Sequence, residues 1–292
     1  MENLRGIALM VAAMGAFALE DMFVKRAAET LPPGQILIIL GTGGAALFGL
    51  LALSRGQRLW SRALVSRPVL LRNLGEIVAT SGYVTAIALT PLSSASAIIQ
   101  ATPLAVTLGA ALFLGAEVGW RRWSAILAGF LGVLLIVRPG AAGFEPTSLF
   151  AVQAVLGLAA RDLASRATPR SVGSLQLSTY AFAVIVPVGA AMLAIGHAGP
   201  APVGAGDALR LGLALGTGMV GYYAIVEAMR VGEVAVVTPF RYTRLLFAMA
   251  IGILVFGERP DGATLAGAAI ILATGLYTLW RERTLSLRSA RR

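Results

Sequence analysis

Five acidic side chains stand inside long apolar stretches of this sequence, where a charge needs a partner or a polar cavity. These residues are Glu20, Asp21, Glu76, Asp162 and Glu227. An ionised side chain at the centre of a bilayer costs about 2.5–3.5 kcal/mol on insertion scales. Such acids are candidates for binding a small polar or cationic molecule. The alternative for Glu20, Asp21 and Asp162 is that each side chain reaches the membrane surface from near a helix end.

A second polar segment lies in apolar surroundings at positions 237–244. Three of its residues recur at every third position along one face: Thr238, Arg241 and Arg244. A guanidinium binds a carboxylate through two parallel hydrogen bonds, so this face predicts a site for an anionic or zwitterionic substrate. The alternative is that the arginines neutralise Glu227 or Glu76 and satisfy carbonyl groups freed by Pro239.

Further candidates for substrate binding lie at the same predicted depth in neighbouring stretches: Tyr83, Gln100, Tyr222 and Tyr223. Gln100 occupies the place in the fourth stretch that corresponds to the arginine segment in the ninth. Tyrosine rings can stack on a substrate ring. With Glu76, Glu227 and the arginine segment, these residues form the predicted substrate site. The alternative is that the tyrosines are core or interfacial aromatics.

Two aspartates each stand four residues before a cation, which is contact spacing on a helix. They are Asp21 before Lys25 and Asp162 before Arg166. We expect these pairs to act as gates. The alternative is an ordinary ion pair near a helix C-terminus, where the dipole favours a cation.

Several classes of site are excluded by what the sequence lacks. It has no cysteine and one histidine, His197, which leaves no zinc site of the usual kinds and no cysteine nucleophile. No Gly-x-x-x-x-Gly-Lys-Ser/Thr loop occurs, so ATP is not the direct energy source. We therefore expect no metal, no cofactor and no enzyme activity.

The composition places these residues in a membrane. Of 292 residues, 57% are hydrophobic and 13% are charged, more apolar surface than a soluble domain can bury. Apolar stretches separated by turn residues predict an all-α integral membrane protein with ten transmembrane helices. We place them near 4–25, 34–53, 69–89, 93–115, 122–138, 148–165, 173–195, 208–229, 233–256 and 262–281.

The net charge of +10 is interpreted as membrane topology, with lipid and not nucleic acid as the partner. Five cations fall in the loops on one side: Lys25, Arg26, Arg138, Arg210 and Arg259. Three fall at membrane depth: Arg161, Arg241 and Arg244. The remaining sixteen of the 24 fall on the other side, which predicts that both termini are cytoplasmic.

The sequence repeats itself at an offset near 141 residues. Asp21 and Lys25 align with Asp162 and Arg166, and positions 88–117, ending Gly-Ala-Glu, align with positions 228–258, ending Gly-Glu. Each copy holds five spans, and an odd number makes the second copy enter the membrane from the opposite side. We therefore expect a first repeat at 1–141, an inverted second repeat at 142–283, and a basic cytoplasmic tail at 284–292.

These features resemble the EamA domains of the drug/metabolite transporter superfamily. The resemblance rests on two five-helix units, each with an Ala-Leu-type helix end, a short turn, a long apolar helix and a Gly-(x)-Glu exit. It covers residues 4 to 281, and within the superfamily it is most similar to the YddG-type exporters of amino acids. Arg244 stands where the alignment puts Pro103 of the first repeat, so the kink of the ninth span is expected at Pro239.

The sequence thus predicts a secondary transporter in the bacterial inner membrane, acting as a monomer or weak homodimer by alternating access around a central cavity. The resemblance implies export of amino acids, including aromatic ones. There are two alternatives: the protein exports toxic cations or drugs, or it exchanges a nucleotide-sugar-like metabolite. Buried arginines favour anionic or zwitterionic cargo, buried acids favour cations, and this chain has both.

Overall fold

The computed structural model describes residues 2–115, 119–140, 144–169, 171–196, 199–231 and 233–289, and these residues contain helices and no strand. The α-helices are α1 (Glu2–Ala27), α2 (Pro33–Ser54), α3 (Arg67–Leu89), α4 (Leu92–Ile99), α5 (Thr102–Leu114), α6 (Trp120–Val137), α7 (Leu149–Arg166), α8 (Ser174–Ile195), α9 (Ala205–Val231), α10 (Val234–Val237), α11 (Thr243–Phe256) and α12 (Gly262–Ser289). Three 3-10 helices lie between them: η1 (Arg62–Val65), η2 (Pro146–Ser148) and η3 (Thr238–Tyr242).

The ten predicted spans correspond to this series of helices. In the described part of the chain, nine segments are long and apolar enough to cross a bilayer. The tenth span is α3, whose 23 residues include Arg72, Asn73 and Glu76 and are correspondingly less apolar. The predicted all-α membrane fold is confirmed. The helix ends differ from the predicted ones by at most three residues, except that α12 continues to Ser289, eight residues beyond its predicted end and into the predicted tail.

Two of the spans are broken, and a proline stands at each break. Pro103 lies in the first turn of α5, just after α4 ends, and Pro239 lies in the first turn of η3, between α10 and α11. Proline has no N–H, so carbonyl groups near it lose their usual donor. At each break a threonine hydroxyl donates to a carbonyl oxygen three residues earlier at 2.6 Å, from Thr102 in the first break and Thr243 in the second.

The chain divides into two compact units, and each draws segments from both halves of the sequence. Unit 1 contains Met1–Met22, Thr90–Ser148 and Gly216–Arg292, and unit 2 contains Phe23–Leu89 and Leu149–Leu215. The division falls within α1 and within α9. Each unit therefore combines helices from both predicted repeats.

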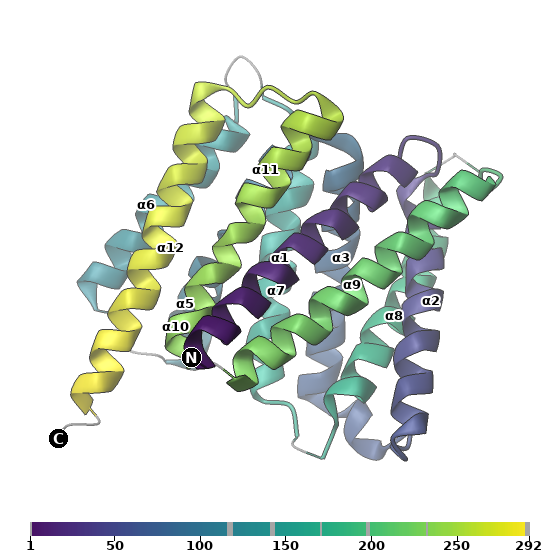
Figure 1. Cartoon of the computed structure of the whole chain (residues 1–292), viewed down its shortest axis with the longest axis horizontal. Helices are drawn as coiled ribbons and strands as arrows, with labels where there is room; N and C mark the ends of the chain where they lie inside the picture. Colours follow the sequence, from purple (N-terminus) through teal and green to yellow (C-terminus); the bar gives the residue numbers. More distant parts are fainter. Residues whose placement is uncertain are drawn as a thin grey trace. The chain divides into compact units, whose positions relative to one another are not determined.

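Within each unit, glycines allow the main helix pairs to approach closely. α2 packs along α8 and α3 along α7 in unit 2, while α6 packs along α12 in unit 1 (Figure 1). One pair of facing glycines marks each contact: Gly34 with Gly189, Gly75 with Gly157, and Gly132 with Gly267. A Cβ on any of the six would lie no more than 2.9 Å from the carbonyl oxygen of its partner glycine. Small residues of this kind allow tight helix packing in lipid, where burial of apolar surface adds little.

We expect alanine at Gly132 or Gly267 to lower the thermal stability of the detergent-solubilised protein. The added methyl group would collide with a backbone oxygen that cannot move without separating α6 from α12. Overpacking of this kind costs about 1–3 kcal/mol. Gly212 of α9 is the matched control, because a Cβ there meets no atom within 4 Å. Gly212→Ala should melt at or slightly above the wild-type temperature, and equal melting of all three variants would show that the glycine contacts are loose.

Candidate functional site

A guanidinium and a carboxylate far apart in the sequence form a two-pronged ion pair in unit 1. Arg244, in the first turn of α11, donates from Nη2 to the two carboxylate oxygens of Asp21 at 2.9 and 2.8 Å, and from Nε at 3.2 Å. The side chain of Asp21 is 4% exposed. The guanidinium also lies 5.4 Å from the centre of the Phe17 ring, within cation–π range. This pair ties α1 to the start of α11.

Glu20 adjoins this pair without joining it. Its carboxylate lies against Gly218 of α9, where a Cβ would approach the carboxylate atoms to 2.9–3.0 Å. Gly221, one turn later in α9, leaves similar space for the Phe17 ring, because a Cβ there would lie 3.1 Å from the nearest ring atom. Among the described residues, Glu20 accepts no hydrogen bond. The cluster of Glu20, Asp21 and Arg244, the unit 1 cluster, therefore holds two carboxylates and one guanidinium.

Unit 2 contains a cluster of the same composition, formed by Glu76, Arg161 and Asp162. Arg161 of α7 lies 2.8 Å from the carboxylate of Asp162 and 3.5 Å from that of Glu76 on α3. Thr80 donates a further hydrogen bond to Glu76 at 3.1 Å. α3 and α7 approach closely at Gly75, where a Cβ would lie 2.6 Å from the backbone nitrogen of Arg161, and this approach places the charged groups together.

The internal repeat relates the aspartates of the two clusters but not their partners. Asp21 and Asp162 are equivalent at the offset near 141 residues, and each accepts from a guanidinium. In unit 1 that group is Arg244, and in unit 2 it is Arg161, which is equivalent to Glu20. The repeat thus keeps an aspartate at this depth while the source of the positive charge differs.

Several predicted contacts differ from those found. Arg244 pairs with Asp21, which was not among the alternative partners considered for it, Glu227 and Glu76. The carboxylate of Asp162 is bound by Arg161, whose guanidinium also reaches α3.

Arg166 lies exposed in the last turn of α7 and, within the described chain, makes no ion pair with Asp162. The ammonium group of Lys25 donates to the carbonyl oxygen of Ile87 at 3.1 Å.

The other predicted substrate residues are divided between the units. Unit 2 holds Tyr83, half-buried, on α3, the helix that also carries Glu76. Unit 1 holds Gln100 at the end of α4, Tyr222, Tyr223 and Glu227 on α9, and Thr238 and Arg241 on η3. Tyr223 is 66% exposed, whereas Tyr222 is half-buried.

Arg241 and Arg244 do not share one buried face. η3 ends at Tyr242 and α11 begins at Thr243, so the two arginines belong to different helices, and Arg241 is exposed. Beside them, the hydroxyl oxygens of Thr238 and Tyr242 are buried and have no hydrogen-bond partner among the described residues.

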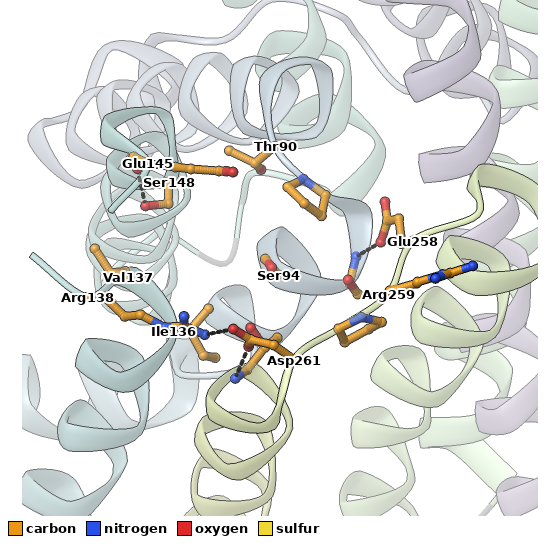
Figure 2. A pocket seen from close by; sticks show the side chains of 14 residues that line it. Thr90, Ser94, Ile136, Val137, Arg138, Glu145, Ser148, Glu258, Arg259 and Asp261 are labelled. Carbon is orange, nitrogen blue, oxygen red and sulfur yellow. Dashed lines mark hydrogen bonds and ion pairs between the residues drawn. The ribbon is translucent and has the colours of Figure 1, made fainter. Parts of the chain in front are cut away.

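A cavity of about 250 Å³ lies in unit 1, at the helix ends opposite those predicted to be cytoplasmic. It is surrounded by the start of α4, the end of α6, η2 and the segment between α11 and α12. Figure 2 shows Glu258 reaching the start of α4 on one side and Asp261 meeting Arg138 on another. Hydroxyl and charged side chains share this lining with Ile136, Val137 and two prolines.

The Glu258 carboxylate caps α4, the first half of a broken span. It accepts hydrogen bonds from the backbone N–H groups of Leu92 at 2.5 Å and Ser93 at 2.9 Å. Gly257 makes this possible by ending α11 in the left-handed region, with φ of 64°. Gly252 leaves the space that the carboxylate fills. The Gly-Glu exit of the second repeat is therefore a helix end that also caps a neighbouring helix.

The ends of α6 and α12 are joined in the same cavity. Asp261 accepts from the backbone N–H of Thr264 at 2.9 Å, which caps α12, and also from the guanidinium of Arg138. The hydrogen bond from Arg138, together with that from Thr264, holds the pKa of Asp261 below its ordinary value. The bond to Asp261 raises the pKa of Arg138, so this pair stays charged at neutral pH.

Family models match both halves of the chain. The EamA-like transporter family matches residues 4–138 and again residues 146–280. The chain belongs to the EamA-like transporter family. It is a multi-pass membrane protein and a secondary transporter of small metabolites, not an enzyme.

Relatives of this EamA protein include transporters with different named cargoes. The pseudopaline exporter CntI of Pseudomonas aeruginosa is 31% identical over 275 residues, which are 91% of this chain and 93% of that protein. The riboflavin transporter of Rhizobium johnstonii is 32% identical over 68% of this chain and 66% of its own length. The S-adenosylmethionine uptake transporter of Rickettsia conorii is 25% identical over 75% and 74%.

A crystal structure with 18% identity aligns with 97% of this chain and 99% of its own at a TM-score of 0.60, which shows a common fold. None of the three named relatives is described as an amino-acid exporter or as YddG-type.

Three features of these sites were missed from the sequence. Phe17, which lies against the Arg244 guanidinium, is apolar and gives no sign of a binding role in the sequence. Arg161 was placed at membrane depth, but no partner was predicted for it. Glu258, which caps α4, entered only as part of the Gly-Glu motif. The one signal that pointed to Glu258 was the glycine before it. His197, and Glu117 of the first Gly-Ala-Glu exit, lie outside the described residues. The described residues contain no group of three or more potential metal ligands.

We expect Glu258→Ala to destabilise the EamA protein by about 1–3 kcal/mol, because two buried N–H groups at the start of α4 would lose their acceptor. Glu258→Gln keeps one acceptor oxygen and should cost less. Glu145→Gln, in the lining of the same cavity, is the control and should leave the melting temperature unchanged. Thermal unfolding in detergent measures all three, and wild-type stability of Glu258→Ala would contradict the capping role.

Proposed function

We propose that this EamA protein exports small zwitterionic metabolites, amino acids and aromatic ones among them, by alternating access. The two-pronged Asp21–Arg244 pair carries this proposal, because its two charges are complementary to the two charges of a zwitterion. Cargo would bind by exchange. The cargo carboxylate would take the place of Asp21 on Arg244, and the cargo ammonium group would bind the released Asp21.

The surroundings of the unit 1 cluster support such a cargo. Glu20 offers a second carboxylate for an ammonium group, and the Phe17 ring offers an apolar face for an aromatic side chain. The buried hydroxyl groups of Thr238 and Tyr242 lie close in sequence to Arg244 and lack partners among the described residues. We propose Gln100, Tyr222 and Glu227 as further contributors from unit 1.

The unit 2 cluster suits the proposed gate. Arg161 bridges α3 and α7 by contacting Glu76 and Asp162, and these contacts can break and form again during transport. Lys25 and Arg166 belong to the same gating proposal.

Direction and location are part of the proposal. The relative aligned over 91% of this chain is an exporter, which favours outward transport, although an uptake transporter is also among the relatives. The three named relatives are bacterial, and the excess of cations in one set of loops favours cytoplasmic termini. We therefore propose a bacterial inner membrane protein with both termini in the cytoplasm.

A second candidate cargo is an organic cation. The unit 1 cluster has two carboxylates and one guanidinium, and Glu20 accepts no hydrogen bond from the described residues. A cation could bind at Glu20 without disturbing the Asp21–Arg244 pair. The two cargo classes thus make different demands on Arg244.

Counterflow into proteoliposomes distinguishes them, with L-phenylalanine, riboflavin and ethidium as labelled cargoes. Arg244→Lys keeps the positive charge and loses the fork, so we expect L-phenylalanine counterflow to fall about tenfold to a hundredfold, as for loss of a charged hydrogen bond. Ethidium counterflow should change little. Arg161→Lys makes the same change in the unit 2 cluster and, as a change in the proposed gate, should lower the counterflow of every cargo alike.

Two results would contradict the proposal. Equal loss of every cargo together with a lower melting temperature in Arg244→Lys would show that the pair is structural. Absence of saturable counterflow of L-phenylalanine by the wild type would exclude zwitterionic amino acids as cargo. Ethidium counterflow that is lost in Glu20→Gln but retained in Arg244→Lys would favour the cation.

A further inference from the structure

All four tryptophans of the chain stand at the helix ends that the topology places in the cytoplasm. Trp60 lies between α2 and α3, Trp120 and Trp123 in the first turn of α6, and Trp280 near the end of the tenth span. Their exposed fractions are 61%, 75%, 36% and 60%. Tryptophan prefers the level of the lipid headgroups. A belt on both sides is usual, and here only one side has it.

The arginines at the two ends of the helices differ in their partners. At the opposite end, three of the four arginines form ion pairs: Arg26 with Glu29, Arg138 with Asp261, and Arg210 with Asp207. At the tryptophan end, the segment from Arg55 to Arg67, which joins α2 to α3 and ends at the first residue of α3, has four exposed arginines: Arg55, Arg58, Arg62 and Arg67. None of these four forms an ion pair with a described residue, and the sequence has no acid between Glu29 and Glu76. Their charges are therefore available to an outside anion.

This segment is held in a defined position in unit 2. Leu64 of η1 is 3% exposed and packs with Val69 and Val172. The side chain of Gln176 donates to the carbonyl oxygen of Arg58 and accepts from the N–H of Gly173 at 2.9 Å. The backbone that carries Arg58, Trp60 and Arg62 is thus fixed from both sides, while the three side chains remain exposed.

An apolar surface continues from this segment along α3. Leu70, Leu71 and Leu74 are 53%, 58% and 56% exposed, and they follow Arg67 within two turns. A molecule that satisfies both features needs an anionic head and long apolar chains. An acidic peptide or a nucleic acid would leave the leucines and the Trp60 ring uncovered.

We propose that Arg58, Trp60 and Arg62 form a binding site for the phosphate of an anionic phospholipid, whose acyl chains lie along α3. A guanidinium matches a phosphate through parallel hydrogen bonds, and the tryptophan ring lies at the boundary between headgroup and chain. In unit 1 the guanidinium of Arg121 lies 5.4 Å from the Trp120 ring, a similar combination of side chains. This site is independent of the cargo.

Native mass spectrometry with dioleoyl phosphatidylglycerol and dioleoyl phosphatidylcholine tests the site. We expect the wild type to retain phosphatidylglycerol in preference. Arg58→Gln and Arg62→Gln should each weaken that retention about fivefold, as for loss of one arginine at a charged membrane surface. Arg259→Gln, an exposed arginine at the opposite end, is the control and should behave as wild type. Melting temperatures without lipid confirm that the variants fold.

A second measurement locates the lipid. With Trp120, Trp123 and Trp280 replaced by phenylalanine, Trp60 is the sole tryptophan, and brominated phosphatidylglycerol should quench it more strongly than brominated phosphatidylcholine. Arg62→Gln in that background should remove the difference. Equal retention of the two lipids by the wild type, or an equal loss of phosphatidylglycerol in Arg259→Gln and Arg62→Gln, would overturn the proposal, as would equal quenching by the two lipids.

Discussion

The hydrocarbon core of a bilayer supplies no hydrogen bonds, so a backbone group that leaves a helix there must find a partner within the protein. This chain breaks two spans, and its side chains make up for each break. At the breaks, Thr102 and Thr243 donate to freed carbonyl oxygens, and at the end of the first broken span Glu258 accepts from the N–H groups that begin α4. Because these partners come from the same unit as the break, each broken span is stabilised within its own unit.

The same constraint explains the arrangement of charges and glycines. Four of the acids at membrane depth, Glu20, Asp21, Glu76 and Asp162, occur in two clusters of two carboxylates and one guanidinium, and a facing pair of glycines brings α3 and α7 close enough to form the cluster of unit 2. Gly218 provides the corresponding space for Glu20. In the proposed mechanism a charged cargo replaces one member of the unit 1 cluster, and this exchange links the packing of the fold to transport.

The transmembrane spans could be predicted from the sequence, but the partners of the charged side chains could not. Runs of apolar residues ended by turn residues located the ten helices, and Pro239 marked the second break. Asp21 and Arg244 stand 223 residues apart, and no local spacing relates them. Asp162 was assigned to Arg166 because four-residue spacing allows contact, but the adjacent Arg161 lies closer to α3 and binds both acids. The sequence does not identify the cargo either, because the cargo depends on which distant side chains come into contact in the fold.

The distance between the Asp21 carboxyl carbon and the Arg244 guanidinium nitrogens is the most direct test of cargo exchange. Solid-state NMR of the labelled protein in lipid can measure it with and without saturating L-phenylalanine. Without cargo, a strong dipolar coupling should report the pair seen here, with nitrogen and oxygen 2.8–2.9 Å apart. With cargo, the coupling should be lost as the cargo carboxylate replaces Asp21. A coupling unchanged by L-phenylalanine, in a preparation that transports it, would contradict exchange at this pair.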